Sequence, residues 1–96
     1  MDVLFEVSSE RARSVLLPAA RACARKSLTW SCFFTHHGVR NLADPELVTL
    51  LAEAQSAVAC EHSWTNFMGR AECPVELGSQ TDNSRLVAEA ARVVSL

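Results

Sequence analysis

A dense group of reactive and aromatic side chains lies in the second half of the sequence, between residues 57 and 78. Its members are Cys60, His62, Trp64, Arg70 and Cys73. A cysteine with a histidine two positions later is suited to nucleophilic chemistry, because a nearby imidazole favours the thiolate. Thiolate sulfur and imidazole nitrogen are also ligands that Zn²⁺ accepts. The spacing therefore indicates a thiol-based reaction or a metal site.

Cys60 closes a short apolar run, Ala57 to Cys60, that is typical of a buried strand. If a helix begins close behind it, at Ser63, the helix N-terminus and the His62 side chain would both lower the pKa of the thiol. Arg70 could then hold the thiolate or an anionic sulfur substrate. We predict Cys60 and His62 as the catalytic pair, with the sulfur exposed at the edge of a sheet. The alternative is that Cys60 is a small apolar strand residue, since free cysteines are often buried.

Other polar and aromatic residues are candidates for binding a substrate. His36 and His37 follow a second apolar run and are alternative partners for the thiol, although histidines on polar loops are usually solvated. Trp64 is expected to cover the site or to pack against a neighbouring subunit. Together with Arg70, these residues form the predicted substrate-binding group.

The composition limits the classes of protein to which the chain can belong. It has 96 residues, of which 49% are hydrophobic, and a formal net charge of −2. Nucleic acid is therefore not an expected partner, and no apolar run reaches the roughly 18 residues that a membrane span needs. The N-terminus has no export-signal pattern, so we expect a cytoplasmic protein with reduced thiols. Cys23 and Cys32 lie in predicted apolar elements and are expected to be structural.

Several common reaction motifs are absent from the sequence. It contains no G-x-G-x-x-G after its first apolar run and no G-x-x-x-x-G-K-[ST], so a glycine loop that binds phosphate is not indicated. It also contains no C-x-x-C pair, which excludes a thioredoxin-like redox motif. We therefore expect no cofactor.

Apolar runs and breaker residues predict alternating strands and helices. The strands are expected at residues 2–7, 28–34, 56–60, 74–77 and 92–96, and the helices at residues 10–26, 44–55 and from 82 or 83 onward. Ser8 and Ser9 are the expected cap of the first helix, in which Pro18 should cause a kink or a restart. Asp82 or Asn83 is expected to cap the last helix.

Strands that alternate with helices of about ten to fifteen residues form βαβ units. We therefore predict a single domain over residues 1–96, an α/β fold that forms a three-layer α/β/α sandwich with a mostly parallel four- or five-stranded sheet. The strand at residues 74–77 should lie at an edge, because a proline begins it. The carboxyl ends of parallel strands share one edge of the sheet. The segments expected to meet there are residues 8–9, 36–37, 60–62 and 79–80.

Several short segments, taken in order along the chain, match the pattern of one known family. They are the serine pair behind the first strand, Phe33 to Val39, Cys60 at the end of the third strand, Val75 to Ser79, the Leu86-Val87 helix and Arg92 to Val94. In this order, the chain resembles the DsrE/DsrF-like family of small α/β proteins, which includes sulfur-relay subunits of the DsrEFH and TusBCD complexes. It departs from the family at Gly69-Arg70, where the order is often Arg-Gly, and at the loop histidines, where an acidic residue is common.

In that family, the cysteine after the third strand, where present, carries persulfide sulfur between partner proteins, and Cys60 matches its position. The resemblance implies sulfur donor and acceptor proteins as partners. It also implies assembly as a homo-oligomer, a trimer or hexamer, or as a hetero-oligomer with related subunits. Because the family includes members without cysteine chemistry, the fold alone does not imply sulfur transfer.

The leading hypothesis is a sulfurtransferase or sulfur carrier in which Cys60 accepts sulfane sulfur as a persulfide and passes it to a partner protein. One alternative is a metal-binding module that uses Cys60, His62 and Cys73. Another is a non-catalytic structural or regulatory subunit of an oligomer. Outside the metal alternative, Cys73 is expected to be a resolving thiol or an edge-strand residue.

Overall fold

The computed structural model describes residues 1–96 and contains five strands and five helical segments. The strands are β1 (Val3–Val7), β2 (Trp30–Phe34), β3 (Ser56–Cys60), β4 (Glu76–Gly78) and β5 (Arg92–Ser95). The helices are α1 (Arg13–Arg25), the 3₁₀ helix η1 (His36–Ala43), α2 (Pro45–Leu51), α3 (Glu61–Met68) and α4 (Gln80–Glu89). A helical segment follows every strand except the last, in agreement with the predicted alternation.

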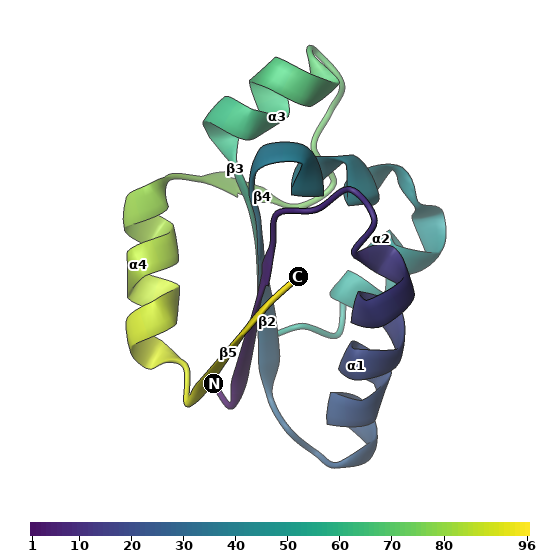
Figure 1. The fold of residues 1–96 in the computed structure, drawn as a ribbon, viewed down its shortest axis with the longest axis vertical. Helices are drawn as coiled ribbons and strands as arrows, with labels where there is room; N and C mark the ends of the chain where they lie inside the picture. Colours follow the sequence, from purple (N-terminus) through teal and green to yellow (C-terminus); the bar gives the residue numbers. More distant parts are fainter.

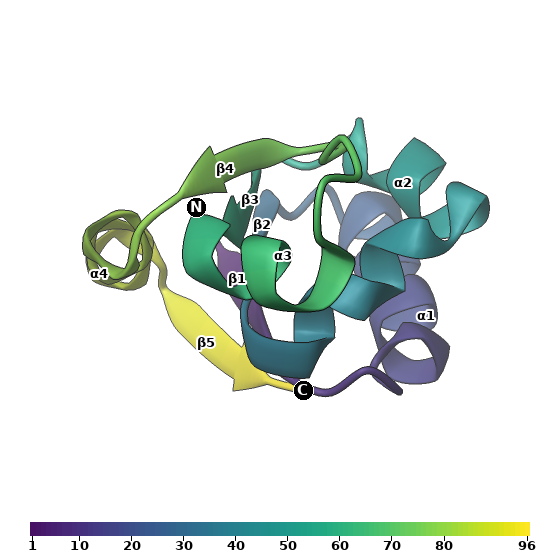
Figure 2. The same ribbon diagram turned by 90° about the horizontal axis from the view of Figure 1, so that it is seen from above.

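The five strands form one sheet in the order β4-β3-β2-β1-β5, and all neighbouring pairs are parallel. Figure 1 shows α1 and α2 on one face of this sheet and α4 on the other, with α3 beyond the carboxyl ends of the strands. Figure 2 shows the same layers from above. The predicted three-layer α/β/α sandwich is confirmed, and β4 lies at an edge as its preceding proline indicated. A segment that could span a membrane is not found among the helices, which are too short or too polar.

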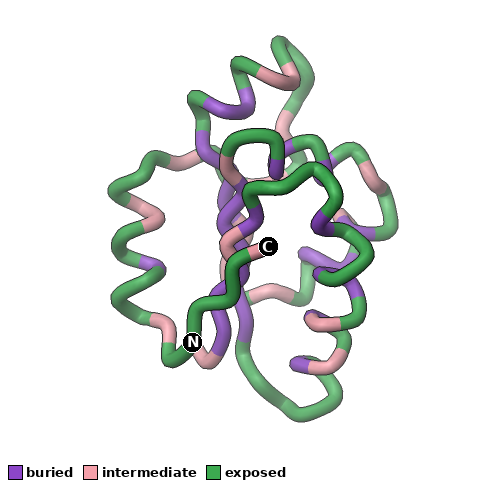
Figure 3. Tube along the Cα trace, in the orientation of Figure 1, coloured by how far each residue is buried: buried purple, intermediate pink, exposed green.

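Side chains alternate between the two faces of the sheet, which gives the protein two unequal cores. The larger core packs against α1 and α2, and its largest members include Phe5, Trp30, Phe34 and Trp64. The smaller core lies under α4 and consists of Leu4, Phe33, Val58, Cys60 and Leu86. Figure 3 shows the buried residues concentrated in the central strands and the exposed ones on the outer helices. Cys60 therefore belongs to the α4 side of the sheet.

Strand β2 contributes to both cores. All five of its residues are buried, and it pairs with β1 on one side and β3 on the other. Phe33 and Phe34 are fully buried on opposite faces, and burying each side chain contributes roughly 1.5–3 kcal/mol. A parallel strand that is covered on both faces is expected to be apolar along its length. The chain leaves β2 at Thr35 and enters η1, next to the carboxyl ends of the other strands.

Helix α1 starts later than predicted and runs without a break through Pro18. It spans Arg13–Arg25, and the side chains of Ser8 and Ser9 do not cap it. The Ser9 hydroxyl instead accepts a backbone hydrogen bond within the turn before the helix. A proline inside a helix costs roughly 3 kcal/mol, and the burial of one face of α1 against the larger core offsets this cost. The predicted cap is therefore wrong, and the helix does not restart at Pro18; a kink there stays a prediction.

The last helix begins earlier than predicted. Helix α4 starts at Gln80 because Ser79 is its N-cap residue. The Ser79 hydroxyl accepts a hydrogen bond from the Asp82 N–H at 3.3 Å, and the Asp82 carboxylate accepts one from the Ser79 N–H at 2.8 Å. This reciprocal pair is a capping box. The prediction of Asp82 or Asn83 as the cap is wrong, because Asp82 closes the cap from inside the helix.

The segment after β2 forms the 3₁₀ helix η1, although the sequence predicts no helix between residues 34 and 44. Gly38 in this helix packs against the main chain of β1: a Cβ atom at this position would lie 2.0 Å from the Val7 carbonyl oxygen. Asn41 is 5% exposed, and its side-chain N–H group donates to the Ser9 and Gly38 carbonyls at 2.8 and 2.9 Å. These contacts hold η1 against the carboxyl end of β1.

Replacing Gly38 with alanine should destabilise the protein, because the added methyl group would collide with the main chain at Val7. We expect Gly38→Ala to lower the free energy of unfolding by about 2–3 kcal/mol, measured by urea denaturation. Gly69→Ala is the control. A Cβ atom at Gly69 would meet nothing within 4 Å, so only the backbone strain at its φ of +62° and ψ of −124° opposes the change, at a cost of about 1–3 kcal/mol. A Gly38→Ala protein as stable as the wild type would contradict the close packing of η1.

Candidate functional site

Strand β3 passes directly into helix α3 at Cys60. Cys60 is the N-cap residue of α3 and has extended backbone geometry, and the helix runs from Glu61 to Met68. The helix that the sequence places at Ser63 therefore begins two residues earlier, directly after Cys60. A helix N-terminus carries free backbone N–H groups and a partial positive charge. These groups lie next to the side chain of the last residue of β3.

Cys60 lines two open hollows at the carboxyl ends of the strands. The residues that line both are Cys60, His62 and Gln80. The α4 hollow has a volume of about 430 Å³ and is completed by Glu61, Thr65, Gly78 and Ser79. The η1 hollow has a volume of about 550 Å³ and is completed by Thr35, His36, Ser63, Asn66 and Phe67. We refer to the two hollows together as the notch, and most of its lining side chains are polar.

Cys60 is more buried than the sequence analysis expects. The residue is 7% exposed, because it packs with Val58 and Leu86 in the smaller core. The prediction of a sulfur exposed at the sheet edge is therefore wrong. Access to the side chain is through the two hollows that it lines.

The pKa of the Cys60 thiol is lowered despite this burial. Burial raises the pKa, but hydrogen-bond donors around the sulfur lower it by more. These donors are the Ser63 hydroxyl, the backbone N–H groups of Ser63 and His62, and the Gln80 side chain. Hydrogen bonds to the charged form of a group favour that form. Neutral donors, rather than a lysine or an arginine, thus stabilise the thiolate.

The other cysteines differ from Cys60 in this respect. Burial is the main cause that raises the pKa of Cys23, of Cys32 and of Cys73. Cys23 and Cys32 are buried in the larger core, as expected for structural residues. Cys73 is partly buried and packs against the same core. Cys60 is therefore the one cysteine whose surroundings favour the thiolate.

His62 lies in the notch, but its ring makes no hydrogen bond to the Cys60 thiol. The side chain is exposed and lines both hollows, and its Nε2 atom is 3.2 Å from the Asn66 side-chain nitrogen, one turn further along α3. The backbone N–H of His62 is the group that faces the sulfur. The imidazole is therefore positioned toward a molecule in either hollow rather than toward the thiol.

The two histidines of η1 have different surroundings. His36 lines the η1 hollow, and its backbone N–H donates to the Ser63 hydroxyl at 2.9 Å. The His37 ring lies 4.3 Å from the Phe67 ring, and the Arg40 guanidinium lies 5.3 Å from the centre of the same ring. His36 thus supports a residue that contacts the thiol, whereas His37 helps to hold η1 against α3.

Trp64 and Arg70 lie outside the notch. Trp64 is 5% exposed, belongs to the larger core and donates its indole N–H to the Ala71 carbonyl at 2.7 Å. Arg70 is exposed beyond the end of α3 and lines neither hollow. The substrate-binding role predicted for these two residues does not fit their positions, because neither side chain borders the space around Cys60.

Two residues without a predicted chemical role lie beside the thiol. Ser63 is 4% exposed and stands between the His36 backbone and Cys60. Gln80 also contacts the Thr35 hydroxyl, with a distance of 3.4 Å between the two side-chain atoms. The sequence predicts that residues 79–80 share an edge with Cys60. It carries no signal that a neutral side chain there contacts the thiol.

The positions of the three residues predicted to bind a metal do not support the metal-binding alternative. The structure contains no group of three or more His, Cys, Asp or Glu side chains that could hold a metal ion. Cys73 packs against the larger core, whereas Cys60 belongs to the smaller core on the other face of the sheet. The predicted set of Cys60, His62 and Cys73 is therefore not assembled.

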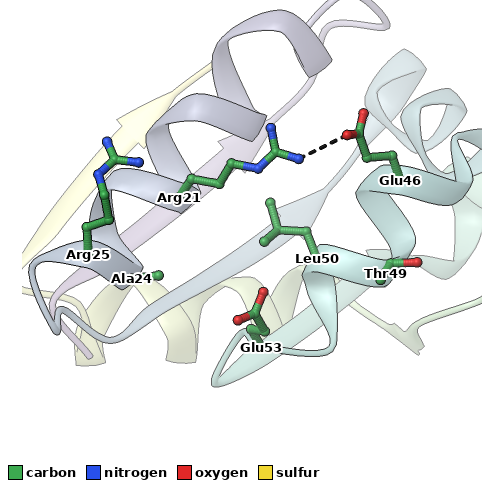
Figure 4. Close-up of a pocket in the computed structure, with 7 residues that line it drawn as sticks. All are labelled: Arg21, Ala24, Arg25, Glu46, Thr49, Leu50 and Glu53. Atoms are coloured by element: carbon green, nitrogen blue, oxygen red, sulfur yellow. Dashed lines mark hydrogen bonds and ion pairs between the residues drawn. The ribbon is translucent and has the colours of Figure 1, made fainter.

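A further hollow, with a volume of about 570 Å³, lies between α1 and α2 (Figure 4). Two of its polar side chains pair with each other, since an Arg21 nitrogen is 3.0 Å from a Glu46 oxygen. Its lining contains neither a cysteine nor a histidine. Although this hollow is slightly larger than the other two, the notch has the more reactive lining and is the better candidate site.

The fold is similar to that of a solved structure. The crystal structure of the YchN protein from E. coli matches it with a TM-score of 0.79 and 14% sequence identity, over 100% of this chain and 99% of that chain. At this identity, the likeness concerns the fold alone. No protein-family model matches the sequence, and none of the curated proteins compared with it matches either.

The lowered pKa predicts that Cys60 reacts with iodoacetamide at a lower pH than Cys73, because only the thiolate is nucleophilic. Cleavage after arginine places Cys60 in the peptide of residues 41–70 and Cys73 in that of residues 71–85, so mass spectrometry measures both rates in one sample. We expect the midpoint of the pH dependence of alkylation to be lower for Cys60 than for Cys73. The reverse order would mean that the donors around Cys60 do not stabilise its thiolate.

Proposed function

We propose that this protein is a sulfur carrier in which Cys60 accepts sulfane sulfur as a persulfide and passes it to a partner protein. The observation that carries this proposal is a thiol of lowered pKa in the wall of two open hollows. Persulfide exchange requires an accessible thiolate and neither a metal nor an organic cofactor. The surroundings of Cys60 meet that requirement.

Sulfur transfer to Cys60 is an exchange without net oxidation. The Cys60 thiolate attacks the outer sulfur of a donor persulfide, so that a new S–S bond forms and the S–S bond of the donor breaks. The donor leaves as a thiolate, which takes the proton that the outer sulfur carried. An acceptor thiolate then attacks the outer sulfur on Cys60, and Cys60 leaves as a thiolate. A thiol of low pKa leaves faster, so the donors around Cys60 assist unloading as well as loading.

Two likenesses support the proposal. The chain resembles the DsrE/DsrF-like family over nearly its whole length, with Cys60 at the position of the sulfur-carrying cysteine. The fold of residues 1–96 is also similar to that of YchN over the whole chain. On this proposal, residues 1–96 form a single DsrE/DsrF-like domain. Its partners are a protein that donates sulfur and a protein that accepts it.

The histidines of the notch have a secondary role in this proposal. His62 lines both hollows and His36 lines the η1 hollow. Their imidazoles are suited to hydrogen-bond the donor or acceptor while its sulfur approaches Cys60. His37 packs on Phe67 and is assigned no contact with the sulfur. Cys60 is the catalytic residue.

Assembly with further subunits belongs to the same proposal. Val87 of α4 and Val93 of β5 are 42% and 44% exposed. Helix α4 has a single buried residue, Leu86, so the face of the sheet that it covers is thinly protected. Exposed apolar side chains of this kind favour contact with another protein surface. A homo-oligomer, or a complex with related subunits, would cover them.

The test of the proposed function is the mass of the protein after incubation with glutathione persulfide. The wild type should gain the mass of one sulfur atom, carried on the peptide of residues 41–70. Cys60→Ser should abolish the gain, because no other cysteine has a stabilised thiolate. Cys73→Ser is the matched control and should keep it, since Cys73 packs on the other core.

A wild type without added sulfur, or a gain that persists in Cys60→Ser, would contradict the proposal. The remaining interpretation would then be a non-catalytic structural or regulatory subunit, which the 7% exposure of Cys60 favours. That interpretation predicts that Cys60→Ser leaves the assembly of the protein unchanged.

A further inference from the structure

Gln80 occupies a central place in the notch. It is the first residue of α4 and lines both hollows together with Cys60. Its side-chain nitrogen donates to the Thr35 hydroxyl at 3.4 Å, and the side chain is one of the neighbours that lower the pKa of the Cys60 thiol. Gln80 therefore connects the ends of β2 and β3.

Asn83 sets the orientation of the Gln80 carboxamide. The side-chain nitrogen of Asn83 donates to Gln80 Oε1 at 3.4 Å, within the first turns of α4. Because the carboxamide oxygen is occupied in this way, the NH₂ group is the end that is turned toward Thr35 and the notch. An N–H group stabilises an anionic sulfur, whereas a carbonyl oxygen repels it. The orientation of this one side chain thus decides whether it helps or hinders the thiolate.

The start of α4 holds Gln80 in place independently of Cys60. The capping box between Ser79 and Asp82 fixes the first turn of the helix. Leu86 of α4 is buried in the smaller core, which packs the same helix onto the sheet. The position of Gln80 therefore does not depend on Cys60.

The charges around the notch make neutral donors important. No lysine or arginine lines either hollow, and the one carboxylate among the lining residues is Glu61. Anionic sulfur in the notch must therefore be stabilised by hydrogen bonds. The side chains that supply them are Ser63 and Gln80. Ser63 is buried, whereas Gln80 is exposed and borders both routes to the sulfur.

We propose that the Gln80 carboxamide donates a hydrogen bond to the sulfur of Cys60 and that Asn83 is the positioning residue that keeps the NH₂ group turned toward it. When Cys60 carries a persulfide, the same N–H group contacts the outer sulfur, which extends from Cys60 into the notch. This contact with the outer sulfur rests on the proposed function. The hydrogen bond from Gln80 to the Cys60 thiol does not depend on it.

The test measures how the rate of Cys60 alkylation depends on pH, using the peptide of residues 41–70. Gln80→Met keeps the approximate length of the side chain and removes the donor. The midpoint of the pH dependence of Cys60 alkylation should therefore rise, and the alkylation rate at pH 7 should fall roughly 3-fold. Gln80→Glu keeps the shape and adds a negative charge, so the fall should be larger. Well above the midpoint, both variants should react at about the wild-type rate. Thr81→Ala, at the neighbouring exposed residue, is the control and should behave like the wild type.

Two substitutions of Asn83 test its positioning role. With Asn83→Asp, the new carboxylate accepts hydrogen bonds but donates none, so the Gln80 NH₂ group should turn toward it and away from Cys60. The midpoint should then rise at least as far as in Gln80→Met. Asn83→Leu removes the anchor without adding a charge and should raise the midpoint less. An effect of Asn83→Asp that remains when combined with Gln80→Met would be a direct effect of charge and would overturn the positioning role.

A Gln80→Met protein with the wild-type midpoint would overturn the proposal. So would a rate that falls equally at all pH values, because that result indicates altered access rather than altered ionisation. Circular dichroism confirms folding of each variant, and Gln80→Glu gives the answer if Gln80→Met does not fold. A wild type that takes up no sulfur would instead overturn the proposed function, and the contact between Gln80 and the thiol would stand.

Discussion

The direct passage of strand β3 into helix α3 is the constraint on which the candidate site depends. Cys60 is both the last residue of the strand and the N-cap of the helix. It packs with Val58 and Leu86 as a strand residue, and its sulfur faces the first backbone N–H groups of α3. The burial of a strand and the free donors of a helix N-terminus thus act on one side chain. A loop between β3 and α3 would separate the thiol from these donors.

Two opposing effects act on the Cys60 thiol, and their balance explains why it differs from the other cysteines. Burial disfavours the thiolate, while hydrogen bonds from neutral donors favour it, and the donors prevail. Cys32 of the neighbouring strand β2 is buried without such donors, and its pKa is raised. A buried position at the end of a parallel strand is therefore insufficient for a reactive thiol. The helix that follows and the side chains of adjacent segments supply what is missing.

Much of the fold could be predicted because the three central strands are short, mostly apolar runs that breaker residues separate. The parallel arrangement then places Cys60, His36 and Gln80 at one edge of the sheet, where the η1 hollow is lined by all three. The roles of individual side chains could not be predicted, since they depend on packing between distant segments. Trp64 and Arg70 are close to Cys60 in the sequence, but the first is buried in the other core and the second lies beyond the end of α3. The place of Gln80 in the lining of both hollows likewise depends on how α4 docks on the sheet.

A crystal structure of the protein after exposure to a persulfide donor would test the central claim most directly. The account predicts an additional sulfur atom bonded to Cys60 Sγ and lying in the notch, within hydrogen-bond distance of Ser63 or Gln80, while α3 keeps its start at Glu61. Additional sulfur on another cysteine with Cys60 unmodified would contradict the account. So would a modified Cys60 that has moved away from the N-terminus of α3.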